Sequence, residues 1–409
     1  MKITYMTTIV SKVMIILALV TIAFFLCFYA LGSPPLALWD ETVNARVVTE
    51  LVQSGSYPNL TYLGTPFLEK PPLWYFLTAQ VVRIAGLSET TLRVVSASSG
   101  FLLILMVLIA AWRWYGALAG MVSAAVLLAT GQFFIVNAGG FFSTHTARSA
   151  DPDLLFVLLI TVTFLCLVRY EERRGIWLTL AAAASALAVL TKGFLGVTPF
   201  IIFFLFTQVR RRKIKIQKDH ILSALLTFFL LVLPWYILMV SRYGSDFLYL
   251  HFGYHIVLRA SVPLEGHGAP WWQYIWVLAA RDVFPFIEIL FFSIVTAIRH
   301  PLFTKTFRIF GPVLIILLFL LIPSIAQTKL SWYILPLYPF AALLTGWFAG
   351  RLWKTVRSEK TPPHARTASI LALAYIMIFL IITIRANVQK IYDRETPLQH
   401  PAFAYNTRL

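Results

Sequence analysis

Long apolar runs alternate with short polar segments along this chain, and the lengths of the runs predict most of its secondary structure. A helix needs about 20 residues to cross the hydrocarbon core of a membrane. Apolar runs of about this length extend from the N-terminus to about residue 31 and then over about 90–112, 116–137, 151–168, 175–191, 194–209, 220–241, 274–298, 309–326, 331–350 and 367–385. The length criterion therefore predicts an all-α polytopic membrane protein with about eleven transmembrane helices.

Composition supports a membrane protein and excludes a soluble one. Hydrophobic residues make up 59% of the 409 residues and charged residues only 12%, whereas soluble domains average about half apolar and a quarter charged. The formal net charge of +17 would suggest nucleic acid as a partner of a soluble protein. Here the basic residues stand in short blocks between apolar runs, so the charge indicates topology instead and no nucleic-acid partner is expected.

The positions of the charged residues predict an orientation. With the N-terminus in the cytoplasm, the basic loops near 113, 169–174, 210–218, 299–308 and 351–360 all fall on the cytoplasmic side, as the positive-inside rule requires. Acidic residues then collect on the opposite side, at Asp40, Glu41, Glu69, Asp151, Asp153, Asp246, Glu265 and Asp282. We therefore expect a multi-pass protein of the inner (plasma) membrane with its active site on the extracytoplasmic face.

One membrane domain over residues 1–390 accounts for nearly the whole chain, followed by a short polar tail at 391–409. The external loops at about 32–89 and 242–273 contain most of the polar residues on the outer side. Within the first of these loops, the apolar stretch 72–86 is too short to span a membrane, so we predict a helix at the interface. Its aromatic residues Trp74, Tyr75 and Phe76 suit the headgroup depth.

Two charged pairs stand out in the first external loop. Asp40 and Glu41 are adjacent carboxylates just beyond a predicted span, and Glu69-Lys70 is followed by two prolines that stiffen the backbone. Such a group of acid, base and cation can catalyse a reaction at a membrane surface. The alternatives are that Asp40 and Glu41 cap a helix beginning near Thr42, and that Lys70 extends to the interface and pairs with anionic lipid.

Five motifs in order along the chain resemble the GT-C glycosyltransferases of the aminoarabinose transferase and protein O-mannosyltransferase superfamily. They are Trp39-Asp40-Glu41, the Phe67–Leu73 stretch, the Ala147–Asp153 stretch, Leu190-Thr191-Lys192-Gly193 and the Lys329–Pro336 stretch. The resemblance implies a GT-C fold and transfer of a sugar, with inversion, from a polyprenyl-phosphate donor on the extracytoplasmic face. The acceptor is left open among a lipid A-like glycolipid, a glycan and a protein side chain.

The resemblance also implies roles for individual residues. Asp40 would be the catalytic base, with Glu41 beside it in the catalytic pair. Asp151 opens the span after Ala150 mainly as a helix cap, whereas Asp153 matches an acidic position that contacts the substrate, as Tyr333 is also expected to do. Because the leaving group is a phosphate, a group of external cations is expected to bind it: Lys70, Arg148, Arg259 and Lys329.

A divalent cation is a further candidate component. Glu69, His255 and His267 offer carboxylate and imidazole ligands in the two external loops, although hydrogen-bonded loop histidines would give the same pattern. A function of a different class is a transporter or flippase that binds a lipid-linked sugar without catalysis. Such a protein would carry its charged residues near the middle of the membrane and show broken, repeated helices.

Overall fold

The computed structural model describes residues 2–33, 35–57, 59–135, 144–210, 216–280 and 287–395. The α-helices are α1 (Lys2–Phe28), α2 (Asp40–Ser54), α3 (Leu73–Ala85), α4 (Glu89–Tyr115), α5 (Ala117–Ala129), α6 (Asp153–Arg173), α7 (Trp177–Lys192), α8 (Thr198–Val209), α9 (Lys218–Phe247), α10 (Arg259–Ser261), α11 (Gln273–Ala279), α12 (Ile287–Arg299), α13 (Phe307–Ile325), α14 (Tyr338–Arg357) and α15 (Pro363–Glu395).

Shorter elements join these helices. They are the strands β1 (Thr61–Tyr62) and β2 (Thr65–Pro66), the 3₁₀ helices η1 (Gly131–Phe133), η2 (Phe194–Val197), η4 (Leu264–Gly266), η5 (Phe303–Lys305) and η6 (Ser331–Leu337), and the π-helix η3 (Leu248–Leu258). The strands form a small antiparallel hairpin in which Thr61 pairs with Pro66 and Tyr62 with Thr65. The fold is therefore helical in its described parts, as the sequence predicted.

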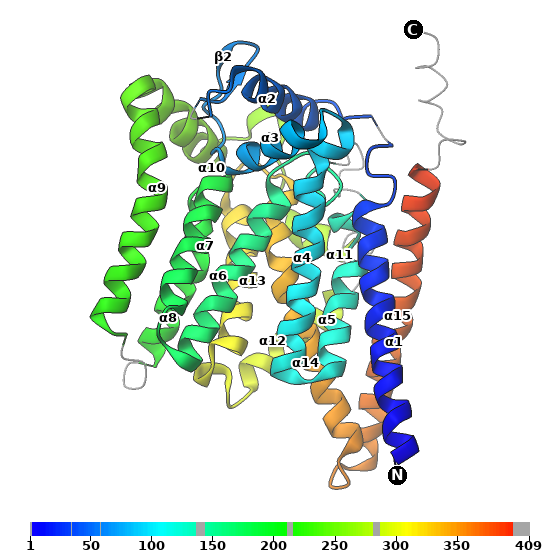
Figure 1. Ribbon diagram of the computed structural model, residues 1–409. Coiled ribbons are helices and arrows are strands. Elements are labelled where there is room, and N and C mark those ends of the chain that lie inside the picture. The colour runs from blue at the N-terminus through cyan, green and yellow to red at the C-terminus, as the bar shows by residue number, and fades with distance from the viewer. Residues whose placement is uncertain are drawn as a thin grey trace.

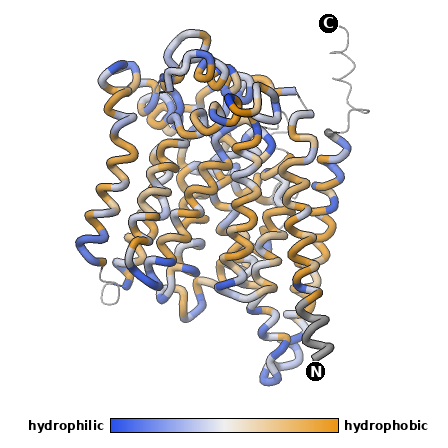
Figure 2. The backbone as a smooth tube through the Cα atoms, in the orientation of Figure 1, coloured by the Kyte–Doolittle hydropathy of each residue, from blue (hydrophilic) through white to orange (hydrophobic). Residues whose placement is uncertain are grey.

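Most of the long helices run side by side as a bundle, with an apolar band between two polar ends (Figures 1 and 2). Among the described residues, 7 helices are long and apolar enough to cross a membrane. Shorter apolar helices, including α5, α7 and α8, lie within the same bundle. The predicted run 274–298 contains residues 281–286, which lie outside the described residues. The total of about eleven spans therefore stays a prediction.

The first polar segment forms a cap across one end of the bundle. Figure 1 shows α2 and α3 lying across the ends of the long helices, on the side opposite the N-terminus. Val47, Val48 and Leu51 of α2 pack in one cluster with Trp74 and Tyr75 of α3. The helix predicted over 72–86 is present as α3. Its position at the membrane interface stays a prediction. The rings of Trp74 and Tyr75 are completely buried within the protein, and their position at headgroup depth stays a prediction.

The two ends of the bundle differ in the connections they carry. The connections α4–α5, α6–α7 and α14–α15 lie at the same end as the N-terminus (Figure 1), and these contain the basic segments 113–116, 173–177 and 357–363. At the other end, the loop before α6 meets α2 through the hydrogen bond from Asn44 to Ala150, and Trp332 of η6 stacks on His145 of that loop. This second end holds the predicted site.

Candidate functional site

Asp40 is the first residue of α2, and it lies in a polar group formed by segments far apart in the sequence. Trp39 turns the chain there with φ of 77°, an unusual value for a residue with a side chain. The Asp40 side chain is 29% exposed, and its Oδ1 lies 3.8 Å from Nζ of Lys70. The structure thus brings together the two residues that the sequence predicted as base and cation.

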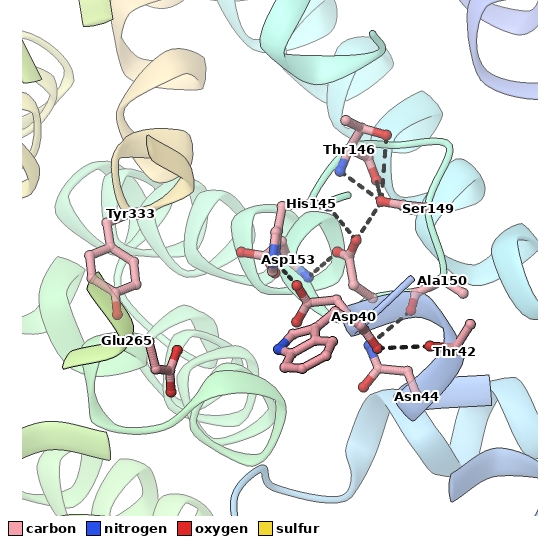
Figure 3. Close-up of polar contacts among 12 residues, drawn as sticks. Asp40, Thr42, Asn44, His145, Thr146, Ser149, Ala150, Asp153, Glu265 and Tyr333 are labelled. Atoms are coloured by element: carbon pink, nitrogen blue, oxygen red, sulfur yellow. Dashed lines mark hydrogen bonds and ion pairs between the residues drawn. The ribbon is translucent and has the colours of Figure 1, made fainter. Parts of the chain in front are cut away.

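His145 links Asp40 to Asp153. Its Nδ1 lies 2.8 Å from Oδ2 of Asp153, and its Nε2 lies 3.3 Å from Oδ2 of Asp40 (Figure 3). Burial of the ring opposes its positive charge. The charge of Asp153 and the hydrogen bonds to both carboxylates outweigh this effect and raise the pKa of His145 to about 9.

The positive charges around Asp40 lower the pKa of its carboxyl group. Partial burial by itself would raise its pKa. The hydrogen bond to His145, together with the positive charges of His145 and Lys70, holds the pKa of Asp40 well below its usual range. Asp40 is therefore an ionised carboxylate at neutral pH.

The loop that carries His145 is held by Asp151. Oδ2 of Asp151 accepts a hydrogen bond from the backbone N–H of His145 at 2.6 Å and another from the Ser149 hydroxyl. Its Oδ1 accepts the backbone N–H of Asp153 at 3.2 Å, so it also satisfies the start of α6 as predicted for a cap. Complete burial, with the charge of Asp153, raises the pKa of Asp151 to about 7 despite the opposing effect of His145.

Asn44 connects this loop to the cap. Its Nδ2 donates to the carbonyl of Ala150 at 2.9 Å, and its Oδ1 accepts from the hydroxyl of Tyr75 at 2.6 Å and from Nζ of Lys70 at 3.5 Å. One amide thus fixes α2, α3, the loop before α6 and the Lys70 side chain relative to one another. On the far side of the site, Asp153 also forms an ion pair with Lys192, the last residue of α7.

Glu41 does not share the environment of Asp40, and its predicted place in a catalytic pair needs correction. The side chain is 2% exposed, and both its oxygens lie 2.8 Å from nitrogens of Arg93. The same oxygens accept the backbone N–H groups of Ala150 at 2.6 Å and Ala37 at 2.8 Å. With its lone pairs used in this way, Glu41 holds the start of α2 against α4 and the loop before α6.

Arg148 was predicted to bind the donor phosphate, but its side chain binds backbone carbonyls instead. Its two terminal nitrogens donate to the carbonyls of Leu26 at 3.1 Å and Tyr29 at 2.7 Å, at the C-terminal end of α1. A cation is favourable there because the last carbonyls of a helix lack intrahelical partners and carry partial negative charge. Its side chain is buried in this contact.

Arg259 and Tyr333 form a second polar group beside the first. Nη1 of Arg259 donates to the Tyr333 hydroxyl at 3.2 Å, and Nη2 lies 3.4 Å from Glu265. Trp332 stands next to Tyr333 and stacks on His145, so this group adjoins the one around Asp40 (Figure 3). Lys329 has a different partner: its Nζ donates to the backbone carbonyl of Ala326.

The three predicted metal ligands are not brought together. Nε2 of His255 lies 3.6 Å from Oε2 of Glu69, but His267 does not join them in any three-ligand group found among the described residues. His267 lies on an exposed turn whose carbonyl accepts the backbone N–H of Lys329 at 2.8 Å. The prediction of a three-residue site was therefore wrong, and at most Glu69 and His255 remain as a pair. Asp282, predicted on the outer side, lies outside the described residues.

Sequence reasoning did not single out His145 as a functional residue, and it used Lys192 only as part of a motif. His145 is one of 8 histidines and lies close before the Ala147–Asp153 motif. Its polar surroundings in an otherwise apolar chain were an available signal. Its partners were not, because Asp40 lies 105 residues earlier in the sequence.

Comparisons with known proteins identify the fold. A family model described as dolichyl-phosphate-mannose-protein mannosyltransferase matches residues 69–238. The crystal structure of ArnT from Cupriavidus metallidurans bound to undecaprenyl phosphate superposes with a TM-score of 0.70 and 21% identity, covering 92% of this chain and 73% of that one. The chain has the GT-C fold. The Archaeoglobus fulgidus oligosaccharyltransferase also shares this fold, with a TM-score of 0.59 at 12% identity over 92% of this chain and 55% of that one.

Relatives by sequence carry the same resemblance. The undecaprenyl phosphate-alpha-4-amino-4-deoxy-L-arabinose arabinosyl transferase of Serratia proteamaculans is 26% identical over 89% of this chain. An uncharacterised protein of Aquifex aeolicus is 27% identical over 79% of it. This chain matches 65% of the length of the Serratia protein and 61% of the length of the Aquifex protein. It therefore spans less than two thirds of either relative. The resemblance to the aminoarabinose transferase and protein O-mannosyltransferase superfamily is thereby confirmed.

Proposed function

We propose that this protein is a glycosyltransferase that moves a sugar from a polyprenyl-phosphate donor to an acceptor at the capped end of the bundle. The observation that carries the proposal is the contrast between two adjacent carboxylates. Glu41 is buried and fully hydrogen-bonded, whereas Asp40 is partly exposed with the Lys70 ammonium 3.8 Å away. A partly exposed carboxylate beside a cation suits proton abstraction next to an anionic leaving group.

The proposed reaction is a single displacement with inversion. The carboxylate of Asp40 takes the proton of an acceptor hydroxyl or amine as the acceptor oxygen or nitrogen bonds to the anomeric carbon. The bond from that carbon to the phosphate oxygen breaks at the same time, and the lipid phosphate leaves with the electron pair. Fixed cations stabilise the negative charge that develops on the phosphate, since they need no reorganisation during the reaction.

Lys70 and Arg259 are the proposed phosphate-binding cations, with Tyr333 as a hydroxyl donor. Both cations lie close enough to His255 to act on it electrostatically, so they approach the same region from different loops. The Tyr333 hydroxyl is bonded to Arg259. Arg148 and Lys329 have backbone carbonyls as partners and are left out of this role.

Asp153 binds His145 at the ring nitrogen opposite the one that faces Asp40. It is buried between His145 and Lys192, so its carboxylate is directed into the protein. We propose that it supports the site through His145 instead of binding the sugar directly, which revises the contact with substrate expected from the sequence.

Of the three ligands predicted from the sequence, Glu69 and His255 remain as a pair that we propose for a divalent cation. Their facing oxygen and nitrogen are 3.6 Å apart, and both atom types are ligands that zinc accepts. Two protein ligands fit a catalytic ion only if water or substrate completes the coordination. A bound ion would stabilise negative charge on the phosphate. Equilibrium dialysis with Zn²⁺ tests the pair, since Glu69→Gln and His255→Gln should each weaken binding.

The relatives support the donor and leave the acceptor open. The Serratia proteamaculans relative is named for an undecaprenyl phosphate-linked aminoarabinose, and the ArnT crystal structure is bound to undecaprenyl phosphate. We propose the same class of donor here, a pentose or hexose on a polyprenyl phosphate. The proposed acceptors are a glycolipid of the lipid A type, a glycan or a protein side chain.

The distribution of charge argues against a flippase. Asp40, Lys70, His145 and Arg259 lie at one end of the bundle, whereas a carrier of lipid-linked sugar would need charged residues near the middle. We further propose that this end faces the extracytoplasmic side of the inner membrane and the N-terminus faces the cytoplasm. The basic connections at the N-terminal end support this orientation.

The deciding experiment identifies the product. Mass spectrometry of envelope glycolipids, glycans and glycoproteins, from cells with and without the gene, should show a species lacking one sugar when the gene is absent. Purified protein with the corresponding polyprenyl-phosphate sugar should then restore that sugar in vitro. Accumulation of donor on one membrane face, with no missing glycoconjugate and no transfer in vitro, would support the flippase instead.

A further inference from the structure

Both the ring and the backbone of His145 are constrained by neighbouring residues. Its ring is 3.8 Å from the Trp332 ring, centroid to centroid, and nearly parallel to it at 12°. Its backbone adopts φ of 61°, a left-handed conformation that is uncommon for a residue with a side chain. The hydrogen bond from its N–H to Asp151 fixes that conformation. Ring plane and backbone are therefore both constrained.

The contacts of the two ring nitrogens determine the charge of His145. A neutral imidazole has one donor and one acceptor nitrogen, whereas an ionised carboxylate only accepts hydrogen bonds. Nδ1 faces Asp153 and Nε2 faces Asp40 (Figure 3). Only the doubly protonated ring can donate to both carboxylates, so the geometry fits an imidazolium ion.

The charged groups form an alternating row through the site. Lys192 pairs with Asp153, Asp153 with His145, His145 with Asp40, and Asp40 with Lys70. Each carboxylate in the row lies between two cations, which stabilises its ionised form. Among the described residues, other ionisable groups face the row as well. Asp151 binds the backbone of His145 and leaves its ring to Asp40 and Asp153. Tyr75 lies near Asp40, Asp151 and Asp153, and His255 lies near Lys70.

We propose that His145 is a positioning residue for sugar transfer, and that its imidazolium holds Asp40 ionised with Oδ2 engaged and Oδ1 directed to the acceptor. This inference rests on the proposed function of Asp40 as base. The ring engages Oδ2, and Oδ1, which lies 3.8 Å from Nζ of Lys70, is the oxygen that takes the proton. The ring thus sets both the charge and the orientation of the base. His145 itself exchanges no proton with the substrate in this scheme.

The proposal predicts a particular pH dependence of kcat/KM. The charge of His145 lowers the pKa of Asp40, so transfer by the wild type should persist as the pH falls. Because the pKa of His145 is raised to about 9, the imidazolium is present below that pH and lost above it. Above that pH Asp40 stays ionised, but the neutral ring has one N–H and can donate to only one of the two carboxylates, so it no longer holds Oδ2 of Asp40 in place. The wild-type rate for a hydroxyl acceptor should therefore decline as the pH rises through about 9.

His145→Gln is the informative variant, because glutamine can still donate to Asp40 but carries no charge. Without the positive charge, burial and the nearby Asp153 raise the pKa of Asp40. The acidic limb of the kcat/KM profile should move upward by about one pH unit or more, and the alkaline decline should disappear. His220→Gln is the matched control: His220 is hydrogen-bonded to Tyr170 at the other end of the bundle, and its variant should keep the wild-type profile.

A double-mutant cycle with Asp40→Asn separates positioning from general loss of structure. If His145 acts through Asp40, adding His145→Gln to Asp40→Asn should leave the residual rate unchanged. A loss of the same factor in both backgrounds, or a His145→Gln profile parallel to that of the wild type, would overturn the role of His145. Wild-type transfer by Asp40→Asn would overturn both this role and the proposed base.

The wild-type protein provides a test that does not depend on folding of the variant. Its rate should be recorded from pH 8 to 10 and again after return to pH 7, so that irreversible loss of protein is excluded. A reversible decline centred near 9 supports the imidazolium. A rate that stays level to pH 10 overturns the proposal even if His145→Gln cannot be purified.

Discussion

The carboxylate of Glu41 and the guanidinium of Arg93 form a buried ion pair with two contacts of 2.8 Å. Arg93 also donates to the carbonyls of Leu31 at 3.0 Å and Pro35 at 3.1 Å. This pair therefore joins α2, α4 and the segment that follows α1. The neighbouring Asp40 makes no such contact with Arg93, so two adjacent acidic residues have different tasks: one stabilises the fold and the other faces the site.

Glu41→Gln should mainly destabilise the protein. Removing one charge of a buried pair leaves Arg93 uncompensated, which typically costs about 3–5 kcal/mol of unfolding free energy. Thermal unfolding in detergent should show a clear fall in midpoint, with activity per folded molecule reduced much less. Glu359→Gln, on an exposed loop at the other end, is the matched control and should unfold like the wild type. Unchanged stability of Glu41→Gln together with lost transfer would return Glu41 to a catalytic role.

The sequence predicted the helical membrane fold because run lengths and charge blocks are local properties. Asp40 and Lys70 could be identified in the same way, since each belongs to a short motif that stands out in an apolar chain. Their place in one external loop suggested that they lie near each other, and the structure places the two charged groups 3.8 Å apart.

The roles of Glu41, Arg148 and His145 could not be predicted, because each depends on a distant partner. Arg93 is 52 residues from Glu41, and Leu26 is 122 residues from Arg148. Residue type alone does not distinguish a cation that binds phosphate from one that binds carbonyls at a helix end. The burial of Trp74 and Tyr75 could not be predicted for a similar reason: exposed aromatic residues and buried ones look alike in sequence, and packing with α2 buries these two.

Asp40→Asn should abolish most sugar transfer without affecting folding. Asparagine keeps the size of the side chain and caps helices about as well as aspartate, but it cannot accept the acceptor's proton. General-base catalysis is worth about 10²–10⁴-fold, and transfer of radiolabelled sugar from the lipid carrier should fall by that factor. Asp219→Asn, an exposed residue at the start of α9, is the control. Near-normal transfer by Asp40→Asn would leave only the helix-cap interpretation of Asp40.

Lys70→Ala should slow the chemical step by removing a fixed cation from the departing phosphate. Loss of one such stabilising group costs on the order of 2.7–4 kcal/mol of barrier, which corresponds to roughly 10²–10³ in kcat. Lys70→Arg keeps the charge and should retain more activity, while Lys360→Ala, exposed at the opposite end, should behave like the wild type. Single-turnover transfer rates measure the effect directly. Equal rates for Lys70→Ala and wild type would reduce Lys70 to a lipid-anchoring residue.

The orientation of the site is tested by cysteines at the two ends of the bundle. Thr65 lies on the exposed hairpin beside the cap, and Gln217 is exposed just before α9 at the other end. Because the basic connections belong inside, Thr65→Cys should react with a membrane-impermeant maleimide in intact cells, and Gln217→Cys should react only after the membrane is opened. The native Cys27 and Cys166 are buried and should contribute little background. The reverse pattern would place Asp40 on the cytoplasmic side, where the donor sugar would have to be used before its lipid carrier crosses the membrane.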